Sequence, residues 1–345
     1  MNINDFAMME PMRYYDNPEP KTPTLREKRW DMISNKDNAY IASTKHDGDW
    51  GCFIHYSKGH NLIRSRSISK VTGVYGDYTA KLPTAVEVMD TWPDNTVILA
   101  EICVDGEGTN ANTIGTILRC LPEKAVERQK TTKLKFWGFD LLMFNGQDYT
   151  NTPYMLRILE LESFLNDDFT EVHGGAPHFR CTDVFADGFD FEDLAHEIIT
   201  NGGEGLVIQR KDNHYWPGTR TAWKTLKLKQ KMDSMELKVV AALDPTKEYT
   251  GDDPEHWPYR DVDGNPVTKP YYYGWKSAIT VEYGNGTTDV ASGLTDSDRE
   301  WLATDMAQKA IESGELYAVI YAMCENDLGK LRHPVFVRFR YPDER

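Results

Sequence analysis

The segment that most constrains the fold of this chain is STKHDGDWGCFIHY, which runs from Ser43 to Tyr56. Lys45 and Asp47 lie two positions apart before a glycine, and Trp50–Tyr56 then alternates as buried strands do. Because Tyr40–Lys45 is also typical of a strand, the segment predicts two strands joined by a turn that carries a lysine and an aspartate. This pair is either a surface ion pair beside a turn or part of a site in which the lysine is a nucleophile.

The first two-thirds of the chain mixes strands with a few helices, which predicts an α+β domain. The first two dozen residues contain four prolines and indicate an irregular arm. Apolar residues at helical spacing predict helices over Leu25–Ser34, with Thr24 as N-cap, and over Phe191–Thr200, with Asp190 as N-cap. The remaining predicted elements are a helix over Tyr154–Leu165 and strands over Asn61–Arg66, Val97–Val104, Leu134–Phe144, Gly205–Gln209 and Trp223–Lys229.

After about Lys231 the pattern changes to short strands. These are predicted over Leu237–Leu243, Ala278–Tyr283, Thr288–Ser292 and Val335–Arg340, with one helix over Asp296–Ser313. A small β-barrel with an inserted helix, of the oligonucleotide-binding (OB) type, fits this order. Residues 244–274 predict a long loop or hairpin, in which DVDGNP is a hairpin turn rather than a calcium loop. We therefore predict two domains, residues 1–231, beginning with the arm at 1–23, and residues 232–345.

Composition narrows the classes of partner and compartment. Lys and Arg number 39 and Asp and Glu number 54, so the net charge is -15. Because phosphate binding needs positive charge, a nucleic-acid partner would require a local basic surface on this acidic chain. The five cysteines include no C-x-x-C pair, which argues against a zinc site and a disulfide framework. No apolar run is long enough to cross a membrane, and the N-terminus lacks the pattern of a secretory signal. We expect a cytoplasmic chain with no membrane partner.

Several other positions carry groups suited to a nucleotide site, and each also has an ordinary structural explanation. Arg66 and Arg64 point to the same face of their strand. This face is either an exposed edge of the sheet or a site of phosphate contacts. Glu101 lies in the apolar strand LAEICV and needs a polar partner if it faces inward. Phe139, in FWGFDLL, is either a core residue or an aromatic face for a base. Glu204 follows two glycines and is either a solvated turn residue or a ligand for a metal ion or a ribose.

A lysine pair follows near the end of this region. Lys227 and Lys229 in WKTLKLK share one strand face, and Arg220 lies just upstream. Two lysines on one face repel each other unless an anion lies between them, so the pair is either an exposed face or a phosphate site. Nearby positive charge and burial also lower the pKa of a lysine, which makes it a better nucleophile.

Taken in order, these segments resemble the covalent nucleotidyltransferase superfamily, and most of all the ATP-dependent DNA ligases. The match runs from Lys45 through FWGFDLLMFNG, EGLVIQR and TLKLK to the C-terminal LRHPVFVRFR. The compact size and that ending are similar to the small ligases of tailed bacteriophages. The resemblance implies a nucleotidyltransferase (adenylation) domain followed by an OB-fold domain, with ATP and Mg²⁺ as cofactors. It also implies a monomeric enzyme of DNA replication, repair or recombination that acts on nicked double-stranded DNA.

In such ligases the lysine that matches Lys45 attacks the α-phosphate of ATP and forms a lysyl-AMP, which releases pyrophosphate. The AMP then moves to the 5′-phosphate at a nick, and the 3′-hydroxyl displaces it and seals the strand. By motif match, Lys227 and Lys229 contact the α-phosphate and help to lower the pKa of Lys45. Asp47 helps to place the metal ion or the 3′ end, and Arg332 positions the leaving pyrophosphate.

The resemblance assigns a second group of residues to the nucleotide. Arg66 would hold a phosphate, Glu101 would accept a hydrogen bond from the ribose, and Phe139 would stack on adenine. Glu204 would serve the metal ion and the nucleotide. Arg220 is assigned to the nucleotide from its place just before the lysine pair.

One position departs from the family motif K-x-D-G-x-R, because the chain has KHDGDW, with Trp50 at the arginine position. A tryptophan cannot replace the planar fork of an arginine, and Arg64 on the adjoining strand is the candidate to compensate. Two alternative functions stay open. One is an RNA ligase of the same superfamily, and the other is a nucleic-acid-binding OB protein without catalytic activity, which Trp50 favours.

Overall fold

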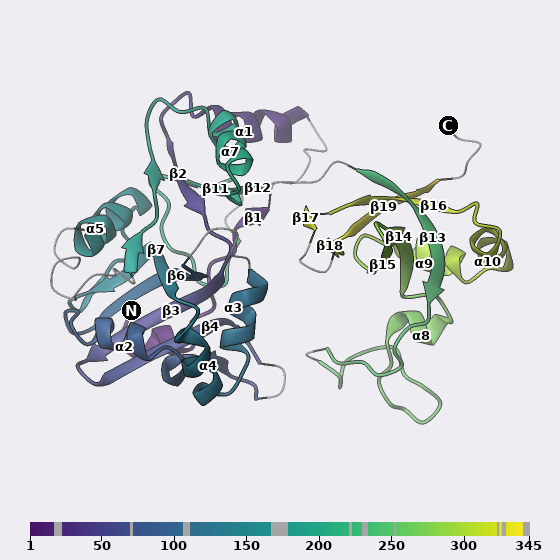
Figure 1. Ribbon diagram of the computed structural model, residues 1–345, viewed down its shortest axis with the longest axis horizontal. Helices are drawn as coiled ribbons and strands as arrows, with labels where there is room; N and C mark the ends of the chain where they lie inside the picture. The colour runs from purple at the N-terminus through teal and green to yellow at the C-terminus, as the bar shows by residue number, and fades with distance from the viewer. Residues whose placement is uncertain are drawn as a thin grey trace. The chain divides into compact units, whose positions relative to one another are not determined.

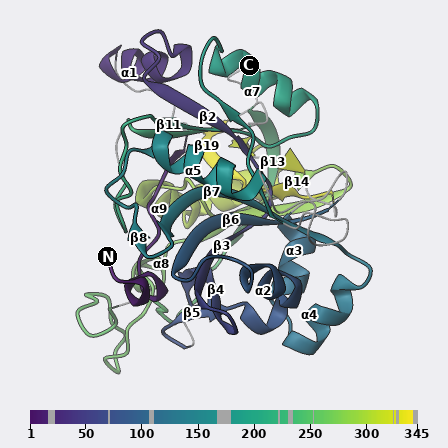
Figure 2. The ribbon, with the colours of Figure 1, turned by 90° about the vertical axis from the view of Figure 1, so that its left-hand side faces the viewer.

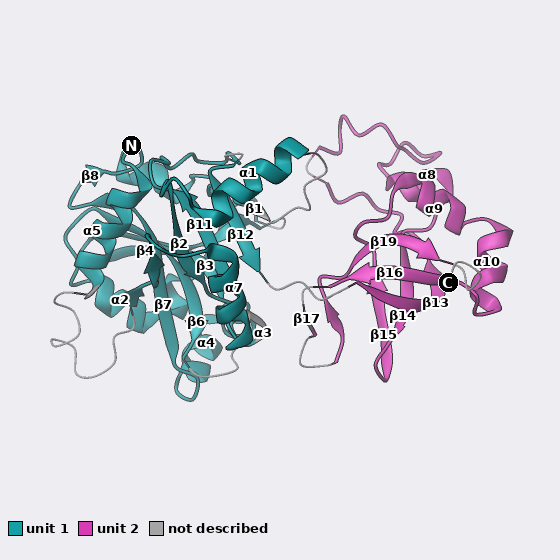
Figure 3. Ribbon diagram, turned by 90° about the horizontal axis from the view of Figure 1, so that it is seen from above, with its two compact units in different colours: residues 1–229 teal, residues 230–345 magenta. Residues whose placement is uncertain are grey.

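The structure is a computed structural model, and the residues that it describes are 1–16, 23–69, 72–105, 111–166, 179–220, 223–229, 234–251, 253–322, 324–325 and 329–340. The chain divides into two compact units, Met1–Lys229 and Gln230–Arg345, which are coloured separately in Figure 3. The boundary predicted between residues 231 and 232 lies outside the described residues. Each unit mixes helices and strands, and each is described here by itself.

The first unit contains two sheets (Figure 1). The larger sheet has the strand order β5-β4-β3-β6-β7-β8, with β9 beside β7. Its strands are β3 (Asp49–Ser57), β4 (His60–Ile68), β5 (Tyr75–Asp77), β6 (Thr96–Val104), β7 (Leu134–Phe144), β8 (Gln147–Asp148) and β9 (Phe179–Cys181). The smaller sheet has the order β1-β12-β11-β2-β10. Its strands are β1 (Tyr15–Asp16), β2 (Tyr40–Lys45), β10 (Val184–Phe185), β11 (Gly205–Arg210) and β12 (Thr225–Lys229).

Alternation along the strands decides which face of the smaller sheet is covered. Ala42, Leu206, Ile208, Leu226 and Leu228 are buried against α1 (Pro23–Ser34) and α7 (Phe191–Thr200), which lie together over this sheet in Figure 2. Because successive side chains of a strand point to opposite faces, the positions between these apolar residues face away from the two helices. Lys45, Lys227 and Lys229 are among those intervening positions.

The larger sheet is covered on both faces. One face packs with the helices α2 (Pro83–Met89), α3 (Ala111–Leu118), α4 (Pro122–Gln129) and α5 (Tyr154–Asn166) in one apolar cluster. The other face packs against Phe6, Met9 and Met12 of the N-terminal segment. This segment, which the sequence marks only as irregular, contains the short 3₁₀ helix η1 (Ile3–Ala7) and β1, which pairs in parallel with β12. A second 3₁₀ helix, η2 (Thr79–Lys81), precedes α2.

The second unit is built on a curled sheet with the strand order β15-β14-β13-β16-β19. The strands are β13 (Met235–Leu243), β14 (Ala278–Tyr283), β15 (Gly286–Val290), β16 (Tyr317–Tyr321) and β19 (Val335–Arg340), with a small hairpin of β17 (Cys324–Glu325) and β18 (Leu331–Arg332). Just beyond β15, Ser292 forms a parallel bridge with Val335, and the amide of Phe336 donates to the carbonyl of Ser292 at 2.8 Å. The two edge strands of the sheet therefore meet at this bridge.

The strands predicted from the sequence are confirmed to within two residues at most ends, and Asp190 caps α7 by accepting from the amides of Glu192 and Asp193. Two predictions are wrong. Thr24 is no cap, because α1 begins at Pro23. The helix predicted over Asp296–Ser313 is two helices, α9 (Asp296–Leu302) and α10 (Asp305–Glu312). The break has a local cause, since the hydroxyl of Thr304 accepts from the amide of Ala307 and starts a new helix.

The long connection between β13 and β14, predicted as a long loop or hairpin, folds on itself. It contains the short helix α8 (Lys269–Tyr273) and a bridge between Glu248 and Val267. The segment DVDGNP forms a turn in which the Asp261 carboxylate accepts from two backbone amides and pairs with Lys247. No described helix of the chain is long and apolar enough to cross a membrane.

Candidate active site

A cavity of about 360 Å³ lies in the first unit and is lined by residues of both sheets. Its volume is within the range of small-molecule sites. Five of the predicted site residues line it: Lys45, Arg66, Glu101, Phe139 and Lys227. The strands β2 and β12 of the smaller sheet supply the lysines, and β4, β6 and β7 of the larger sheet supply the other three.

Lys45 lies at the end of β2, where its ammonium forms an ion pair with the carboxylate of Glu204. Both side chains are mostly buried, with exposed fractions of 18% for Lys45 and 10% for Glu204. Among the described residues, this buried oxygen of Glu204 has the Lys45 ammonium as its polar contact. A carboxylate in such a pair is within reach of a proton of the ammonium.

Glycine at position 205 is required by the close packing of β11 on β12. Its φ is +133°, and a Cβ atom there would lie 2.0 Å from the carbonyl oxygen of Leu228. Gly205 pairs with Lys45 on one side and with Lys229 on the other. The two lysines therefore flank a residue without a side chain, on the same face of the sheet.

Glu101 lies on β6, paired in register with Trp50 on β3 and with Trp137 on β7. Burial raises the pKa of its carboxyl to about 7, while the positive charge of Lys45 acts in the opposite direction. Near neutral pH the group is therefore present in both protonation states. It can accept a hydrogen bond from a hydroxyl group of a ligand, or donate one.

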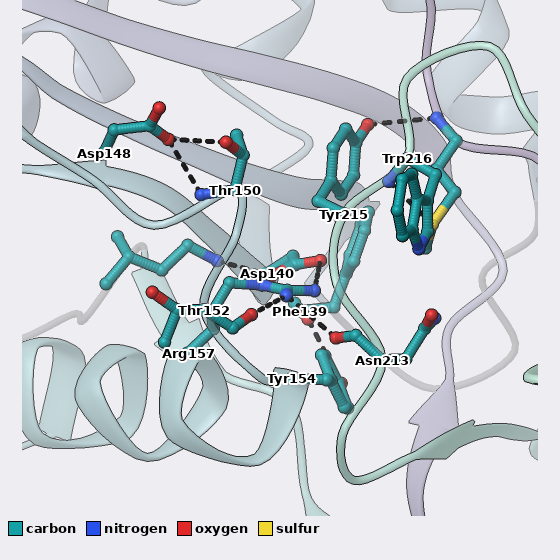
Figure 4. A network of polar contacts seen from close by, with 12 residues as sticks. Phe139, Asp140, Asp148, Thr150, Thr152, Tyr154, Arg157, Asn213, Tyr215 and Trp216 are labelled. Carbon is teal, nitrogen blue, oxygen red and sulfur yellow. Dashed lines mark hydrogen bonds and ion pairs between the residues drawn. The ribbon is translucent and has the colours of Figure 1, made fainter. Parts of the chain in front are cut away.

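Phe139 is turned toward the cavity by a bulge in β7. The register between β6 and β7 shifts between Leu99 and Ala100, which leaves Phe139 as the extra residue. Beneath it, Asp140 forms a fully buried, two-pronged ion pair with Arg157, at 2.7 and 3.0 Å (Figure 4). The hydroxyl of Tyr154 donates to the carbonyl of Phe139 at 3.3 Å. These contacts fix the backbone that carries the aromatic ring.

Trp50 lines the cavity, and its ring packs on the guanidinium of Arg64 with a separation of 5.4 Å from the ring centroid. Arg64 is buried and donates to the backbone carbonyls of Phe6, Met9 and Ser65. The expectation that Arg64 compensates for Trp50 is therefore wrong, because its donors hold the N-terminal segment on the sheet. Trp50 gives the cavity an apolar wall in place of a cation.

A smaller hollow of about 240 Å³ also adjoins Lys45 and is lined by Asp47, Asp105 and Glu204, among others. No group of three or more His, Cys, Asp or Glu side chains in the described residues could hold a metal ion by itself. Mg²⁺ usually binds through one or two carboxylates, with water and substrate phosphates completing its shell. Glu204 and Asp47 fit that donor set.

The sequence did not mark several residues of the main cavity. Asp49 and Arg119 both line it, and burial raises the pKa of Asp49 while Arg119 acts in the opposite direction. Tyr14 comes from the N-terminal segment, and the ammonium of Lys227 lies 5.6 Å from the centroid of its ring. His46 also lines the cavity and stacks on Trp137, and burial lowers its pKa to about 4, so it is neutral at physiological pH.

Three predicted residues line neither of these two cavities. Lys229 ends β12 and is paired with Gly205. Arg220 is exposed and pairs with Arg13 in an isolated bridge beside the main cavity. Arg332 belongs to β18 of the second unit, so its contact with the nucleotide stays a prediction.

Residues 26–229 match the family model described as the ATP dependent DNA ligase domain. The DNA ligase of Methanocorpusculum labreanum is 29% identical over 204 residues, which cover 58% of this chain and 34% of that protein. The DNA ligase of Pyrobaculum calidifontis is 23% identical over 219 residues, which cover 62% of this chain and 36% of that protein. The chain thus spans about a third of the length of these curated relatives.

Solved structures share the fold. A chain from a structure-function study of Lig E DNA ligases superposes with a TM-score of 0.58 at 17% identity, covering 89% of this chain and 93% of that one. A second chain, described as Pmar-Lig_Pre, superposes with a TM-score of 0.61 at 20% identity and covers 87% of this chain and 63% of its own length.

Proposed function

This chain belongs to the family of the ATP-dependent DNA ligase domain, and we propose that it is an ATP-dependent DNA ligase that seals nicks in duplex DNA. The observation that carries the proposal is the placement of Lys45. It lies in a cavity of nucleotide size together with Arg66, Glu101, Phe139 and Lys227, and it is ion-paired with Glu204.

In the first step the deprotonated Nζ of Lys45 attacks the α-phosphorus of ATP. A P–N bond forms, the bond from the α-phosphorus to the bridging oxygen breaks, and pyrophosphate leaves. Glu204, the ion-pair partner, accepts the proton of the ammonium. The positive charges of Lys227 and Lys229 favour the neutral amine of Lys45 and stabilise the charge that develops on the phosphate. Mg²⁺ bound through Asp47, and through Glu204 before that carboxylate takes up the proton, would neutralise phosphate charge.

The next two steps move the AMP. An oxygen of the 5′-phosphate at the nick attacks the phosphorus of lysyl-AMP, the P–N bond breaks, and the Lys45 amine takes up a proton. The 3′-hydroxyl then attacks the activated 5′-phosphate, gives up its proton, and releases AMP as the phosphodiester bond forms. Phe139 stacks on the adenine, Glu101 bonds the ribose, and Arg66 with Arg220 holds phosphates.

The second unit takes the role of an OB-fold domain in this proposal. Its strand order, with α9 and α10 between β15 and β16, and the bridge that joins the two edge strands both support a small OB-type barrel. Arg332 of this unit would position the pyrophosphate. The enzyme would work as a monomer of the small bacteriophage type in DNA replication, repair or recombination.

The test is the intact mass of the purified protein, first freed of AMP with pyrophosphate and then given Mg²⁺ with ATP or GTP. We expect a mass gain equal to one AMP with ATP only, and no gain in Lys45→Ala. The matched control is Lys130→Ala, because Lys130 is also paired with a glutamate but is 67% exposed on the surface. Joining of nicked DNA and of nicked RNA by the loaded enzyme then separates the DNA ligase from the RNA ligase. No mass gain in the wild type would favour the binding protein without activity.

A further inference from the structure

His46 directly follows Lys45 at the end of β2, and its ring stacks on Trp137 of β7. The two ring centroids are 4.5 Å apart, and the ring planes differ by 4°. Because β2 belongs to the smaller sheet and β7 to the larger one, this stack connects the two sheets beside Lys45. The motif K-x-D-G-x-R leaves the position of His46 open, so membership of the family assigns this residue no role.

The hydroxyl group of Thr182 contacts the residues on both sides of Lys45. It donates to the carbonyl of Thr44 at 3.1 Å, and its oxygen lies 3.1 Å from Nε2 of His46. Thr182 is 2% exposed, and its amide donates to the carbonyl of Gly138 on β7 at 2.9 Å. One buried hydroxyl group, anchored to the larger sheet, therefore holds the chain immediately before and immediately after Lys45.

The direction of these hydrogen bonds determines which nitrogen of His46 carries a proton. A carbonyl oxygen can only accept, so the single hydroxyl proton of Thr182 is used in the bond to Thr44. Nε2 of His46 must then donate to the hydroxyl oxygen, which requires a proton on Nε2. The same donor is present when the ring is protonated on both nitrogens, so this hydrogen bond does not depend on the charge of His46.

Thr182 lies where the chain crosses from one sheet to the other. Before it, β9 pairs with β7 of the larger sheet, and after it, β10 pairs with β2 of the smaller sheet. The amide of Thr44 also donates to the carbonyl of Asp183 at 3.0 Å. Residues of both sheets line the main cavity, so a shift of β2 relative to β7 would move Lys45 relative to a nucleotide bound there.

We propose that His46 is a positioning residue for the first step of the reaction, and that it acts through the hydroxyl group of Thr182 to hold the backbone of Lys45 against the larger sheet. The proposal rests on the proposed function, in which Lys45 attacks ATP. Loss of the hydrogen bond should slow this attack and change the ATP concentration for half the maximal rate very little. The final joining step needs no attack by Lys45, so it should be affected far less.

The experiment measures AMP uptake by the full chain, freed of AMP with pyrophosphate, as intact mass over time at a series of ATP concentrations. His46→Phe keeps a ring that can stack on Trp137 and loses the donor. Thr182→Val removes the hydroxyl group at nearly constant shape, and Thr182→Ser retains it. Joining of a nicked duplex that already carries AMP on its 5′-phosphate is measured on every variant, and circular dichroism checks the fold.

The matched control is His60→Phe. His60 is also stacked on an aromatic ring, that of Tyr56, with ring centroids 4.4 Å apart, but it is exposed in the hairpin of β3 and β4. Its substitution should leave AMP uptake at the wild-type rate, because it changes a histidine in the same unit without touching the chain around Lys45.

We expect His46→Phe and Thr182→Val each to slow AMP uptake at saturating ATP on the order of tenfold. The ATP concentration for half the maximal rate and the rate of the joining step should stay within about twofold of the wild type. Thr182→Ser should recover most of the rate of AMP uptake. The double variant His46→Phe with Thr182→Val should lose little more than either single variant, because both changes remove the same hydrogen bond.

Several results would overturn the proposal. These are an uptake rate of folded His46→Phe equal to that of His60→Phe, additive losses in the double variant, and equal losses in AMP uptake and joining. A proton on Nδ1 instead of Nε2, detected by NMR of the ring nitrogens of His46, would contradict the hydrogen bond whether or not the protein takes up AMP. A wild type that takes up no AMP would overturn the proposed function and the positioning role together, whereas failure of the variants alone would overturn only the positioning role.

Discussion

At the scale of single residues, the ionisation of Glu101 makes the charge of the main cavity depend on pH. Its folded-state pKa is raised by burial from 4.5 to about 7, so the folded protein holds this proton more tightly than the unfolded chain does. The stability that comes from this group is therefore fully present below about pH 4.5 and is lost as pH rises through about 7. At higher pH the buried, ionised Glu101 lowers the stability of the folded protein. A hydrogen bond to the ribose of a bound nucleotide would offset this loss.

Glu101→Gln removes the ionisation and keeps the size of the side chain. We expect the variant to gain stability over the wild type as pH rises, by about 2 to 3 kcal/mol at about pH 8 and by much less at about pH 5. The measurement is the free energy of unfolding from urea titrations at both pH values. Glu87→Gln, an exposed change on α2, is the control, and its effect should be the same at both. A pH-independent difference for Glu101→Gln would contradict the assigned ionisation.

The residues that could be predicted from the sequence are those whose direction follows from strand alternation. Lys45, Glu101 and Lys227 occupy polar positions in otherwise apolar strands, and the structure directs all three to one cavity. Tyr14 and Arg119 could not be found in this way. Tyr14 reaches the cavity only because the N-terminal segment packs across the larger sheet, and Arg119 follows the end of α3. Both depend on contacts between segments far apart in the chain.

At the scale of elements, the register of β11 between β2 and β12 positions the lysines. Gly205→Ala places a methyl group against the carbonyl of Leu228 and puts a side chain at a φ of +133°. We expect a loss of about 3 kcal/mol or more in the free energy of unfolding, and slower AMP uptake by Lys45, because β11 and β12 must move apart. Thermal and urea unfolding measure the first effect, and intact mass over time measures the second.

Gly202→Ala is the matched control for this change. Gly202 also has a positive φ, of +88°, but no atom of a described residue other than its chain neighbours lies within 4 Å of a Cβ atom built there. Its substitution should cost only the backbone strain, about 1 to 2 kcal/mol, and leave AMP uptake near the wild-type rate. Equal effects of the two changes would show that close strand packing at Gly205 does not matter.

Elements with a clear period were predicted well, and the failures have local causes. β16 (Tyr317–Tyr321) was not predicted, because its short apolar run cannot be separated from a buried helical turn by periodicity alone. Its Ala318 and Ile320 are buried between β13 and β19, so long-range pairing decides the strand. The break between α9 and α10 depends on the cap at Thr304, which a continuous apolar pattern conceals.

At the scale of the whole molecule, the two compact units have separate cores and divide the proposed chemistry. The cavity that Lys45 lines is built from residues of the first unit. Arg332 belongs to the second, on a short hairpin whose Leu331 is buried in that unit's core. If Arg332 positions the leaving pyrophosphate, the second unit must take part in the first step of the reaction.

Arg332→Ala tests this requirement. Loss of one cation that stabilises the departing pyrophosphate should slow AMP uptake by Lys45 about 100-fold. Joining of a nicked duplex that already carries AMP on its 5′-phosphate should fall far less, because no pyrophosphate leaves in that step. Single-turnover rates of the two steps give the comparison. Arg338→Ala, an exposed change on β19 of the same unit, should leave AMP uptake unchanged. Equal losses in both steps for Arg332→Ala would indicate that the residue binds DNA. An unchanged rate of AMP uptake would show that Arg332 of the second unit takes no part in the first step.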